Sequence, residues 1–374
     1  MSDAYIEAAA RLTAELLEPS AVEVEQEGVP RSHLDALAKA GLLGLRAPAE
    51  VGGSSSPRSV FRAVGEILAG ACPTTWFVQE QHHTPMLLLA ASAAPLRAEL
   101  LPKLATGEVV AGIAFAHLRR FPERPVVAER VAGGWRFQGS APWYTGWGIN
   151  DVMLLGGIDD QAHIVWVIIE AAPRPGLRAS PPMQTAAVAG AMTVGLDFDG
   201  LVVGDRHVVA RMPHEVWQAR DDVSASDAKP AMFGVTAAAL RELARAGERD
   251  AEAASLAALL RSRLDQVRAH CYRLADDDPD GHRLDERRAG RAEASVLLTT
   301  ATTALVVASG GRAMTPDDPA GRLARTALFL LVQAQTLPAR AAALHRWHTL
   351  AGNAAGGVLS CTAAHGGWRR LPGG

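Results

Sequence analysis

The spacing of hydrophobic residues changes twice along the chain, and the first part is helical. Leu34, Leu37 and Leu42 fall on one helical face after the N-cap candidate Ser32, and a second apolar stripe runs through residues 60–68. Glycine and proline separate these segments at short intervals. We therefore predict an N-terminal α-helical domain over residues 1–111.

From residue 109 onward the pattern becomes that of a β domain. Short runs rich in Val, Ile and aromatic residues alternate with Gly, Pro or Asp up to about Pro213. No alternation of strands with helices occurs, and neither a Gly-x-Gly-x-x-Gly nor a Walker loop is present. The pattern predicts a β-barrel or sandwich over residues 112–215 and excludes a Rossmann or P-loop domain.

Helical periodicity returns in the last part of the chain. Four long segments, at residues 229–246, 250–275, 285–309 and 319–349, are separated by Gly247, by the acidic turn at 276–281 and by Gly310 with Gly311. Helices of this length with short loops indicate a four-helix bundle within residues 216–351. The glycine-rich residues 352–374 are predicted to be a disordered tail.

A stretch in the β domain, residues 133–148, combines a hairpin with a glycine-hinged loop. Gly133 suits a tight turn, and Pro142 is expected to end the strand because proline donates no ladder hydrogen bond. Trp143 and Trp147 then stand beside flexible backbone, with the Thr145 hydroxyl as a possible donor. This surface suits a planar cofactor, and packing of the tryptophans into a β core is the alternative.

Composition narrows the classes of function. The chain has 374 residues, is 48% hydrophobic and 21% charged, and carries a formal charge of -3 with mixed signs, which argues against nucleic-acid binding. The longest apolar run, residues 296–308, contains four threonines and is shorter than the ~20 residues of a spanning helix, so no membrane segment is expected. The N-terminus lacks a signal pattern, and three scattered cysteines without Cys-x-x-Cys spacing favour a reducing cytoplasm and no zinc site. The adjacent His82 and His83 lie about 100° apart on a helix, so we expect core or surface histidines and no metal pair.

Four motifs in this order resemble the acyl-CoA dehydrogenase family over about residues 5–350. They are Leu-Ala-Lys-Ala-Gly-Leu-Leu-Gly-Leu at 37–45, Leu-Pro-Lys-Leu-Ala-Thr-Gly-Glu at 101–108, Gly-Trp-Arg-Phe-Gln-Gly-Ser-Ala-Pro-Trp-Tyr-Thr-Gly at 134–146, and the double glycine at 310 followed by residues 319–327. The resemblance implies an FAD between the β domain and the C-terminal bundle of a homodimer or homotetramer. It also implies an acyl thioester substrate, dehydrogenated by α-proton abstraction and hydride transfer to flavin, with an electron-transfer flavoprotein as a possible partner.

The resemblance assigns cofactor contacts to several residues. They are Phe115, Ala116 and His117 at a strand end, Trp143 and Thr145 beside the flavin ring, and Gly310, Gly311 and Thr336 in the C-terminal part.

The sequence departs from the family at three places. Residues 115–122 replace a Leu-Thr-Glu-Pro-x-Ala-Gly-Ser-Asp motif and introduce Arg119 and Arg120, which meet either an anion or solvent. Near Arg249 the Phe-Gly that accompanies the family's pyrophosphate-binding arginine is missing.

The third departure concerns the catalytic base. Ala334 occupies the place of the usual glutamate, with glutamine on each side, and glutamine does not titrate. Asp227, near the start of the first bundle helix, is the alternative candidate base, and a helix cap is its other reading.

Three functions remain open from the sequence. The first is an FAD-dependent acyl-CoA dehydrogenase-like oxidoreductase with a displaced base. The second is a two-component flavin monooxygenase supplied by a separate flavin reductase, and the third is a non-catalytic structural homologue.

Overall fold

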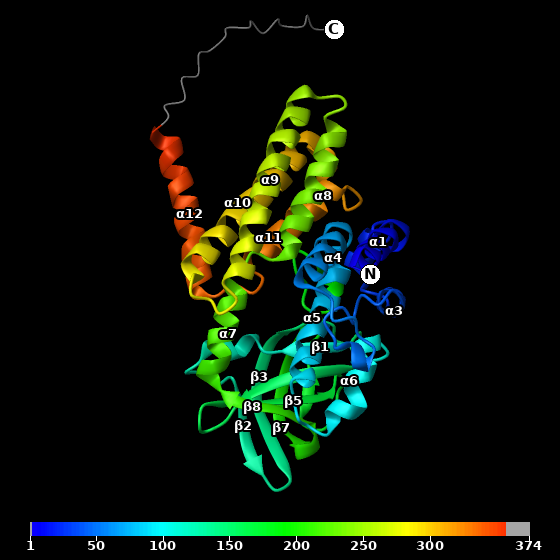
Figure 1. Ribbon diagram of the computed structural model, residues 1–374, viewed down its shortest axis with the longest axis vertical. Helices are drawn as coiled ribbons and strands as arrows, with labels where there is room; N and C mark the ends of the chain where they lie inside the picture. The colour runs from blue at the N-terminus through cyan, green and yellow to red at the C-terminus, as the bar shows by residue number, and fades with distance from the viewer. Residues whose placement is uncertain (1, 357–374) are drawn as a thin grey trace, which may run out of the picture.

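The computed structural model describes residues 2–356, and its N-terminal part is helical (Figure 1). The elements are α1 (Ser2–Leu12), the π-helical turn η1 (Thr13–Leu17), α2 (Ala21–Glu27), α3 (Arg31–Lys39), η2 (Ala49–Val51), α4 (Arg58–Ala71), α5 (Pro73–Ala90) and α6 (Leu96–Thr106). The predicted stripe of α4 is largely buried at Val60, Val64 and Leu68. This confirms a helical region ahead of the β domain.

The middle region is one eight-stranded sheet with the order β6-β7-β3-β2-β4-β5-β8, and β1 pairs with β4 in parallel. The strands are β1 (Ala111–Ala114), β2 (Val126–Val131), β3 (Gly134–Tyr144), β4 (Val152–Ile158), β5 (His163–Glu170), β6 (Leu177–Ala179), β7 (Val194–Gly204) and β8 (Val208–Pro213), with short turns η3 (Ala116–Arg120), η4 (Ala189–Ala191) and η5 (Asp205–His207).

Alternate residues of the central strands enter two different cores. On β5, Val165 and Val167 pack into a core shared with β3 and β7, whereas Ile164 and Trp166 pack against α5 and α6. Because side chains alternate across a strand, burial on both faces produces the continuous apolar run that the sequence shows. The sheet is thus curled around one core and covered by helices on its other face (Figure 1).

The hairpin predicted at Gly133 is confirmed, because Val131 pairs with Gly134 across an antiparallel β2–β3 turn. The predicted end of the strand at Pro142 is wrong, since β3 continues to Tyr144. The register between β3 and β7 shifts between Ala141 and Tyr144, so this irregularity removes Pro142 from the ladder without ending the strand.

The C-terminal region begins with α7 (His214–Ser226), which leads from the sheet to the long helices α8 (Pro230–Ala246), α9 (Ala251–Asp277) and α10 (Leu284–Ser309), followed by η6 (Gly310–Met314), α11 (Pro319–Val332) and α12 (Leu337–Gly356). The segment predicted as one helix over 319–349 is two helices, because the chain turns between Gln333 and Thr336 with Ala334 at a positive φ of 51°. Residues 352–356, which were predicted to belong to a disordered tail, are helical because α12 extends to Gly356. Residues 357–374, the rest of that prediction, lie outside the described residues.

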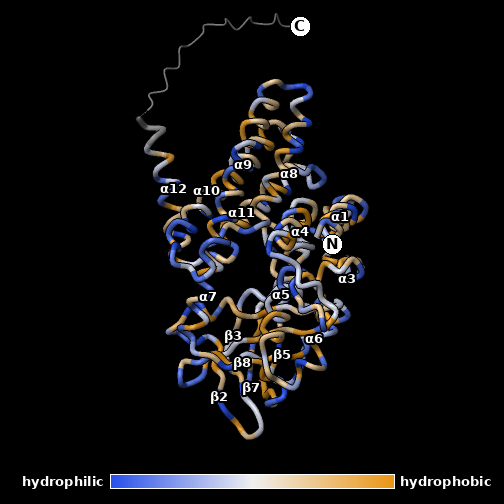
Figure 2. The backbone as a smooth tube through the Cα atoms, viewed as in Figure 1, coloured by the Kyte–Doolittle hydropathy of each residue, from blue (hydrophilic) through white to orange (hydrophobic). Residues whose placement is uncertain are grey.

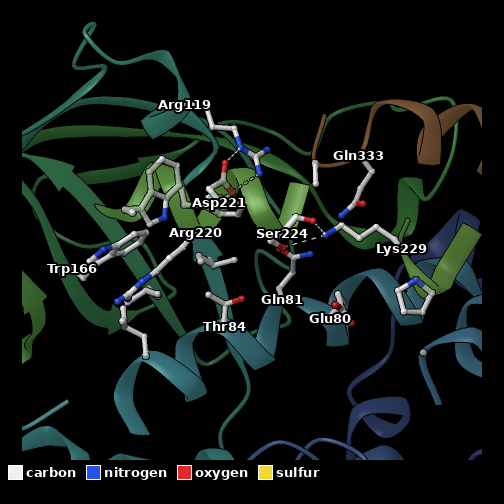
Figure 3. A pocket seen from close by; sticks show the side chains of 18 of the residues that line it. Glu80, Gln81, Thr84, Arg119, Trp166, Arg220, Asp221, Ser224, Lys229 and Gln333 are labelled. Atoms are coloured by element: carbon white, nitrogen blue, oxygen red, sulfur yellow. Dashed lines mark hydrogen bonds and ion pairs between the residues drawn. The ribbon is translucent and has the colours of Figure 1, made fainter. Parts of the chain in front are cut away.

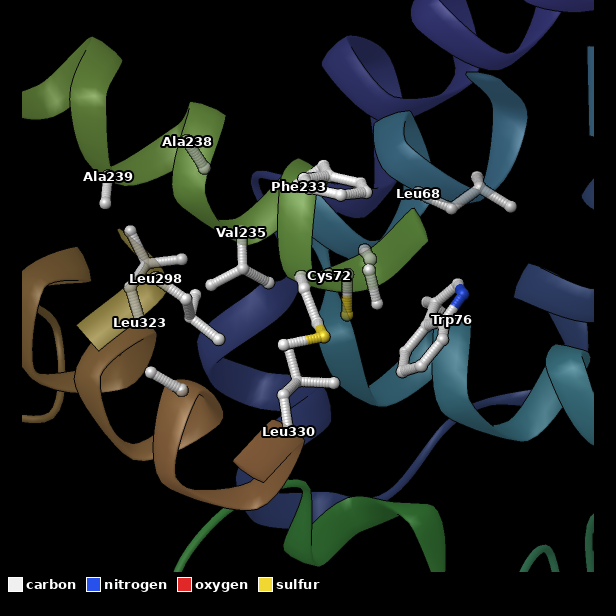
Figure 4. Packing of buried hydrophobic residues seen from close by; sticks show 14 of the residues in the cluster. Leu68, Cys72, Trp76, Phe233, Val235, Ala238, Ala239, Leu298, Leu323 and Leu330 are labelled. Carbon is white, nitrogen blue, oxygen red and sulfur yellow. The ribbon is translucent and has the colours of Figure 1, made fainter. Parts of the chain in front are cut away.

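The helical core joins the N-terminal and C-terminal helices. Figure 4 shows Leu68, Cys72 and Trp76 of the N-terminal helices facing Phe233 and Val235 of α8. The helices α4 and α8 approach closely at Gly234, where a Cβ would lie 2.1 Å from the Glu66 carbonyl oxygen. Hydrophobic residues follow these packed faces, and polar residues gather on the outer surfaces (Figure 2).

Within the described residues, the segment Leu284–Met314 is long and apolar enough to cross a membrane by length and composition alone. It passes this test as the central helix of the bundle, since α10 packs against α8, α9, α11 and α12.

The contact between α5 and the sheet is fixed by a buried histidine. His82 Nδ1 accepts a hydrogen bond from the Ala111 amide at 3.0 Å, and Nε2 therefore carries the proton that is donated to the Leu104 carbonyl at 3.0 Å. Burial lowers the pKa of His82 to about 4, so the ring stays neutral. His83 is buried beside it and contacts Gln79, which confirms both residues as core histidines.

Candidate functional site

A cavity of about 330 Å³ lies where the N-terminal helices, the sheet and the C-terminal helices meet. Its walls come from α4, α5, the strands β1, β4, β5 and β8, α7, the start of α8 and the turn between α11 and α12. Figure 3 shows the polar side chains of Glu80, Gln81, Ser224 and Lys229 gathered on one side of it. The cavity has the size of a small-molecule site.

Glu80 is the most unusual side chain in this cavity. It projects from the largely buried helix α5, and its carboxyl has no ion pair or hydrogen bond with any side chain in the described part of the chain. Burial raises the pKa of Glu80 to about 7, against the opposing charges of Lys229 and Arg46. A carboxyl with this pKa exchanges a proton at neutral pH.

Lys229 immediately precedes α8 and faces the same cavity. Its Nζ donates hydrogen bonds to the carbonyl oxygen and the Oγ of Ser224, at 2.6 and 3.2 Å. Burial and the charge of Arg291 lower the pKa of Lys229 to about 8. An ammonium group has three donors, so one remains for a ligand.

The two arginines singled out in the sequence are both paired. Arg119 holds Asp221 through two hydrogen bonds of 2.7 and 2.8 Å, which link η3 to α7, and Arg120 pairs with Glu123. The Arg119 guanidinium also lies 5.1 Å from the centre of the Phe115 ring. The Arg119–Asp221 pair thus forms part of the cavity wall, and Asp221 is not a free carboxylate.

Ala334 lies on the cavity wall, as its match to the family's glutamate position requires. The turn that presents it is held by Arg291, which donates to the Gln333 carbonyl oxygen at 2.7 Å and to the Ala225 carbonyl oxygen at 2.5 Å. The Gln333 Oε1 is buried without a hydrogen-bond partner among the described residues. The turn therefore offers a methyl group and an unused acceptor where a carboxylate would stand.

Asp227 lies outside the cavity, in the link between α7 and α8. Arg287 on α10 holds its carboxylate with two hydrogen bonds of 2.7 and 2.8 Å, and only 3% of the Arg287 side chain is exposed. Arg287 also donates to the carbonyl oxygen of Asp278. The structure thus gives Asp227 a role in joining helices, and it does not bring Asp227 together with Phe115 and Ala334.

The residues expected at the flavin ring are divided between surface and core. Trp143 is 58% exposed and has a positive φ of 67°, a strained conformation for an aromatic residue that is typical of binding sites. Thr145, in contrast, is buried, and its hydroxyl shares a hydrogen bond of 3.1 Å with Thr193. Trp143 thus presents an aromatic face to solvent, whereas the Thr145 hydroxyl is engaged with Thr193 in the interior.

The predicted strand-end contacts lie beside the cavity. Phe115 lines it directly. Ala116 begins η3, and the next residue, His117, is buried with Nε2 2.7 Å from the Gly156 carbonyl oxygen and Nδ1 without a partner among the described residues. Burial lowers the pKa of His117 to about 4, so this histidine is neutral.

The C-terminal candidates fall in two separate places. Gly310 and Gly311 follow α10, where a Cβ would meet nothing within 4 Å. Thr336 ends the turn that contains Ala334, and its hydroxyl accepts a hydrogen bond of 3.4 Å from the Ala339 amide. Thr336 is thus near the cavity in sequence and space, whereas neither glycine lines the cavity.

Sequence reasoning missed Glu80 and Lys229. A signal for Glu80 was available, because it is the one Asp, Glu, Lys or Arg in a long helical segment, and such a residue is uncommon in a largely buried helix. Lys229 gave no such signal, since a lysine before the first turn of a helix is ordinary. Among residues 2–356 no group of three or more His, Cys, Asp or Glu side chains is arranged to hold a metal ion.

The N-terminal part of the chain is similar to a known protein family. Residues 2–108 match the family model of the acyl-CoA dehydrogenase N-terminal domain. No curated protein sequence matches the chain.

Solved structures resemble nearly the whole chain at low identity. A chain from the structure of the electron transferring flavoprotein of Acidaminococcus fermentans has a TM-score of 0.80 at 17% identity, covering 92% of this chain and 97% of that chain. Butyryl-CoA dehydrogenase from Megasphaera elsdenii has a TM-score of 0.79 at 15% identity, covering 95% and 98%. Dibenzothiophene monooxygenase from Paenibacillus sp. A11-2 has a TM-score of 0.75 at 16% identity, covering 93% and 96%.

These matches define the fold of the chain. The chain has the acyl-CoA dehydrogenase fold, with an N-terminal helical region, a middle β-sheet domain and C-terminal helices. The resemblance to the acyl-CoA dehydrogenase family is confirmed by the N-terminal family model together with this fold. The fold is shared by dehydrogenases and by a flavin monooxygenase, so it leaves the reaction to be argued from the cavity.

Proposed function

We propose that the protein is an FAD-dependent oxidoreductase that dehydrogenates an acyl thioester across its α and β carbons. The observation that carries the proposal is the Glu80 carboxyl, which faces the cavity without a partner and has a pKa of about 7 raised by burial. A general base is most effective when its pKa lies near the working pH. Glu80 therefore replaces Asp227 as the candidate base, because the carboxylate of Asp227 is held by Arg287.

The proton of the α carbon passes to the Glu80 carboxylate in this proposal. The negative charge that the substrate then gains is placed on its thioester carbonyl oxygen, where the free N–H of Lys229 donates a hydrogen bond. A positively charged donor in a partly dry cavity stabilises such an oxyanion strongly. The FAD, when bound, accepts the hydride from the β carbon.

The surroundings of the cavity fit a flavin. Phe115 lines the cavity, as does Gln333, whose buried Oε1 has no hydrogen-bond partner among the described residues. Outside the residues that line the cavity, Trp143 presents an exposed aromatic face on strained backbone, and the buried Nδ1 of His117 also has no partner. A planar, hydrogen-bonding ring system satisfies such a set of groups. Thr336 and the two glycines after α10 are proposed contacts for the remainder of the cofactor.

A two-component flavin monooxygenase is the second candidate. Ala334 favours it, because a methyl group stands on the cavity wall where the dehydrogenase family places its carboxylate. Such an enzyme takes reduced flavin from a separate reductase, whereas a dehydrogenase passes electrons to an electron-transfer flavoprotein. In both cases we propose a cytoplasmic homodimer or homotetramer.

The absorption spectrum of the purified protein is the first test. Flavin bands equivalent to one FAD per chain that bleach anaerobically with an acyl thioester are expected for the dehydrogenase. A colourless protein that binds only reduced flavin and then consumes oxygen would establish the monooxygenase. A protein that binds flavin in neither redox state would leave only the structural homologue.

The substitution Trp143→Ala tests the cofactor contact. Because more than half of this side chain is exposed, its removal is expected to leave the fold intact and to lower the flavin retained after gel filtration. The exposed Trp347 on α12, replaced in the same way, is the matched control. Equal flavin content in the wild type and the Trp143 variant would remove Trp143 from the site.

A further inference from the structure

Lys229 is one of only three lysines among the 37 lysine and arginine residues of the chain. The other two, Lys39 and Lys103, are exposed on the surface, whereas Lys229 lines the cavity. Arginine does the structural work of a buried cation nearby, as Arg291 does at the turn that presents Ala334. A lysine differs from an arginine because its amine can lose a proton in a protein and then act as a nucleophile.

The hydrogen bonds of the Lys229 amine leave one direction open. Nζ lies 2.6 Å from the carbonyl oxygen and 3.2 Å from the Oγ of Ser224, and Figure 3 shows this contact beside Gln81. An unprotonated amine has two N–H groups and one lone pair, so these two contacts use both hydrogens. The lone pair then takes the third direction, which has no partner among the described residues and is left for a molecule in the cavity.

A purely structural role explains only part of this arrangement. The contact with the Ser224 carbonyl oxygen satisfies the last turn of α7, which is an ordinary use of a lysine. A lysine that serves through its charge is normally paired with a carboxylate when it leaves the surface. In the described part of the chain Lys229 forms no ion pair, since Asp221 is held by Arg119 and Asp227 by Arg287. The amine therefore lacks the contact that would keep it protonated.

Four charged groups act on the Lys229 amine from the surrounding elements. They are Arg291 of α10, Glu80 of α5, Asp221 of α7 and Asp227 in the link before α8. Loss of hydration and the charge of Arg291 outweigh the three carboxyl groups and lower the pKa of Lys229 to about 8. At pH 7 the amine is thus unprotonated on the order of a hundredfold more often than an ordinary lysine. A neighbouring cation is a general means of activating a lysine for attack on a carbonyl carbon.

The same cavity provides a proton donor and an apolar wall. The Glu80 carboxyl is unpaired among the described residues and has a pKa of about 7, so at neutral pH it both donates and accepts protons. The apolar side is formed by Trp76, Leu88, Ile113, Leu154 and Trp166. A small carbonyl compound with a hydrocarbon or aromatic substituent therefore matches the cavity on both sides.

We propose that Lys229 is a nucleophilic amine that forms an imine with an aldehyde or ketone held in the cavity. The lone pair of Nζ adds to the carbonyl carbon, and a proton passes from the nitrogen to the carbonyl oxygen. The Glu80 carboxyl then protonates the new hydroxyl, which leaves as water while nitrogen and carbon form a double bond. The Glu80 carboxylate takes back the proton that remains on the nitrogen. One water is released, Glu80 is unchanged at the end, and no flavin is needed, so this reactivity goes beyond the proposed oxidation.

Trapping of the imine in the full chain tests the proposal. The protein is incubated at pH 7 with benzaldehyde and sodium cyanoborohydride, which reduces an imine to a stable benzylamine, and the labelled sites are mapped by proteolysis and mass spectrometry. We expect the label to appear at Lys229 at least tenfold faster than at Lys39 and Lys103, because more of the Lys229 amine is unprotonated. The α-amino group of the chain, with an ordinary pKa of about 7.7–8.0, is the internal reference for reagent activity.

Substitutions separate the amine from its charge. Lys229→Arg keeps a cation with donors for Ser224 and should lose the label at this position, while Lys103→Arg is the matched control and should leave the labelling of Lys229 unchanged. If Lys229→Arg fails to fold, the three lysines of the wild type still decide the question, because their rates are compared within one sample.

Glu80→Gln tests the proton donor. Loss of this carboxylate makes the Lys229 amine easier to deprotonate, which by itself would speed labelling. A severalfold slower rate in Glu80→Gln, with no change in the exposed control Glu215→Gln, therefore identifies proton donation by Glu80. An equal or faster rate would overturn the part assigned to Glu80.

Two results would overturn the nucleophilic amine itself. One is labelling of Lys229 no faster than that of Lys39 and Lys103, and the other is the same total label in the wild type and Lys229→Arg. Flavin content, measured on the same samples, separates this inference from the proposed function. A colourless protein that is labelled at Lys229 keeps the imine and contradicts the oxidoreductase, whereas a flavin-containing protein without the label does the reverse.

Discussion

The carboxylates of Glu80 and Asp227 have opposite surroundings. Asp227 is locked to Arg287 by two short hydrogen bonds in the seam between α7, α8 and α10. Glu80, on α5, faces the cavity without a partner in the described part of the chain. A paired carboxylate contributes to stability and is poorly placed for chemistry, whereas an unpaired one in a cavity costs stability and titrates near neutral pH. Asp227 therefore stabilises the contact between the helices, whereas Glu80 is the carboxyl that is placed for proton transfer in the cavity.

The largest effect on stability is expected from removing the ion pairs of Arg287 with Asp227 and Asp278. Arg287→Leu leaves Asp227 and Asp278 without their cation, and loss of one partner of a buried ion pair costs about 3 kcal/mol. Urea denaturation should show a lower midpoint than that of the wild type. Arg273→Leu, at an exposed position on α9, is the control. An unchanged midpoint for Arg287→Leu would show that the ion pairs of Arg287 do not stabilise the fold.

The next effect concerns catalysis at the cavity. Glu80→Gln removes the base while keeping the side-chain shape, and we expect kcat/KM for the substrate found by titration to fall by about 10²–10⁴-fold. In the wild type kcat/KM should rise with pH and level off above about pH 7, because Glu80 must be ionised to accept a proton. Glu215→Gln, at an exposed site on α7, should leave the rate unchanged. Loss of α-proton exchange in Asp227→Asn with full exchange in Glu80→Gln would return the role of base to Asp227.

The same comparison predicts how stability responds to pH. The pKa of Glu80 is raised from 4.5 to about 7 in the folded protein, so the folded state holds this proton more tightly than the unfolded state. The resulting stabilisation is fully present below pH 4.5 and is lost as the pH rises through 7. Glu80→Gln should therefore gain roughly 2 kcal/mol relative to the wild type between pH 5 and 8. A pH-independent difference in melting temperature would contradict a buried, titrating Glu80.

The smallest effect is expected at the turn that presents Ala334. Its positive φ of 51° is unfavourable for alanine and free for glycine. Ala334→Gly should stabilise the protein by about 0.5–1 kcal/mol, less the entropy that glycine adds to the unfolded chain. Ala327→Gly within α11 should instead destabilise, because that residue has helical backbone and is buried. Destabilisation by both substitutions would show that the turn depends on the Ala334 methyl group.

The sequence predicted the secondary structure correctly where residues that are close together in the chain determine it. The apolar runs of β4 and β5, the turn at Gly133 and the breaks after α8 at Gly247 and after α10 at Gly310 each follow from a few neighbouring residues, and the structure contains them. Errors arose where a distant contact decides the local outcome. Pro142 stays within β3 because of an irregularity against β7, and the helix predicted over 319–349 breaks at a turn held by Arg291 from α10.

For the candidate site, the sequence by itself determined the class of fold and the absence of a carboxylate at Ala334, because both are carried by residue type and order. Only the tertiary structure decided which carboxylate stands free. Asp227 and Glu80 are alike as isolated side chains, and they differ because the fold brings Arg287 against one and places the other in a cavity. Desolvation and ion pairing depend on residues more than 50 positions away, so they exist only once the chain has folded.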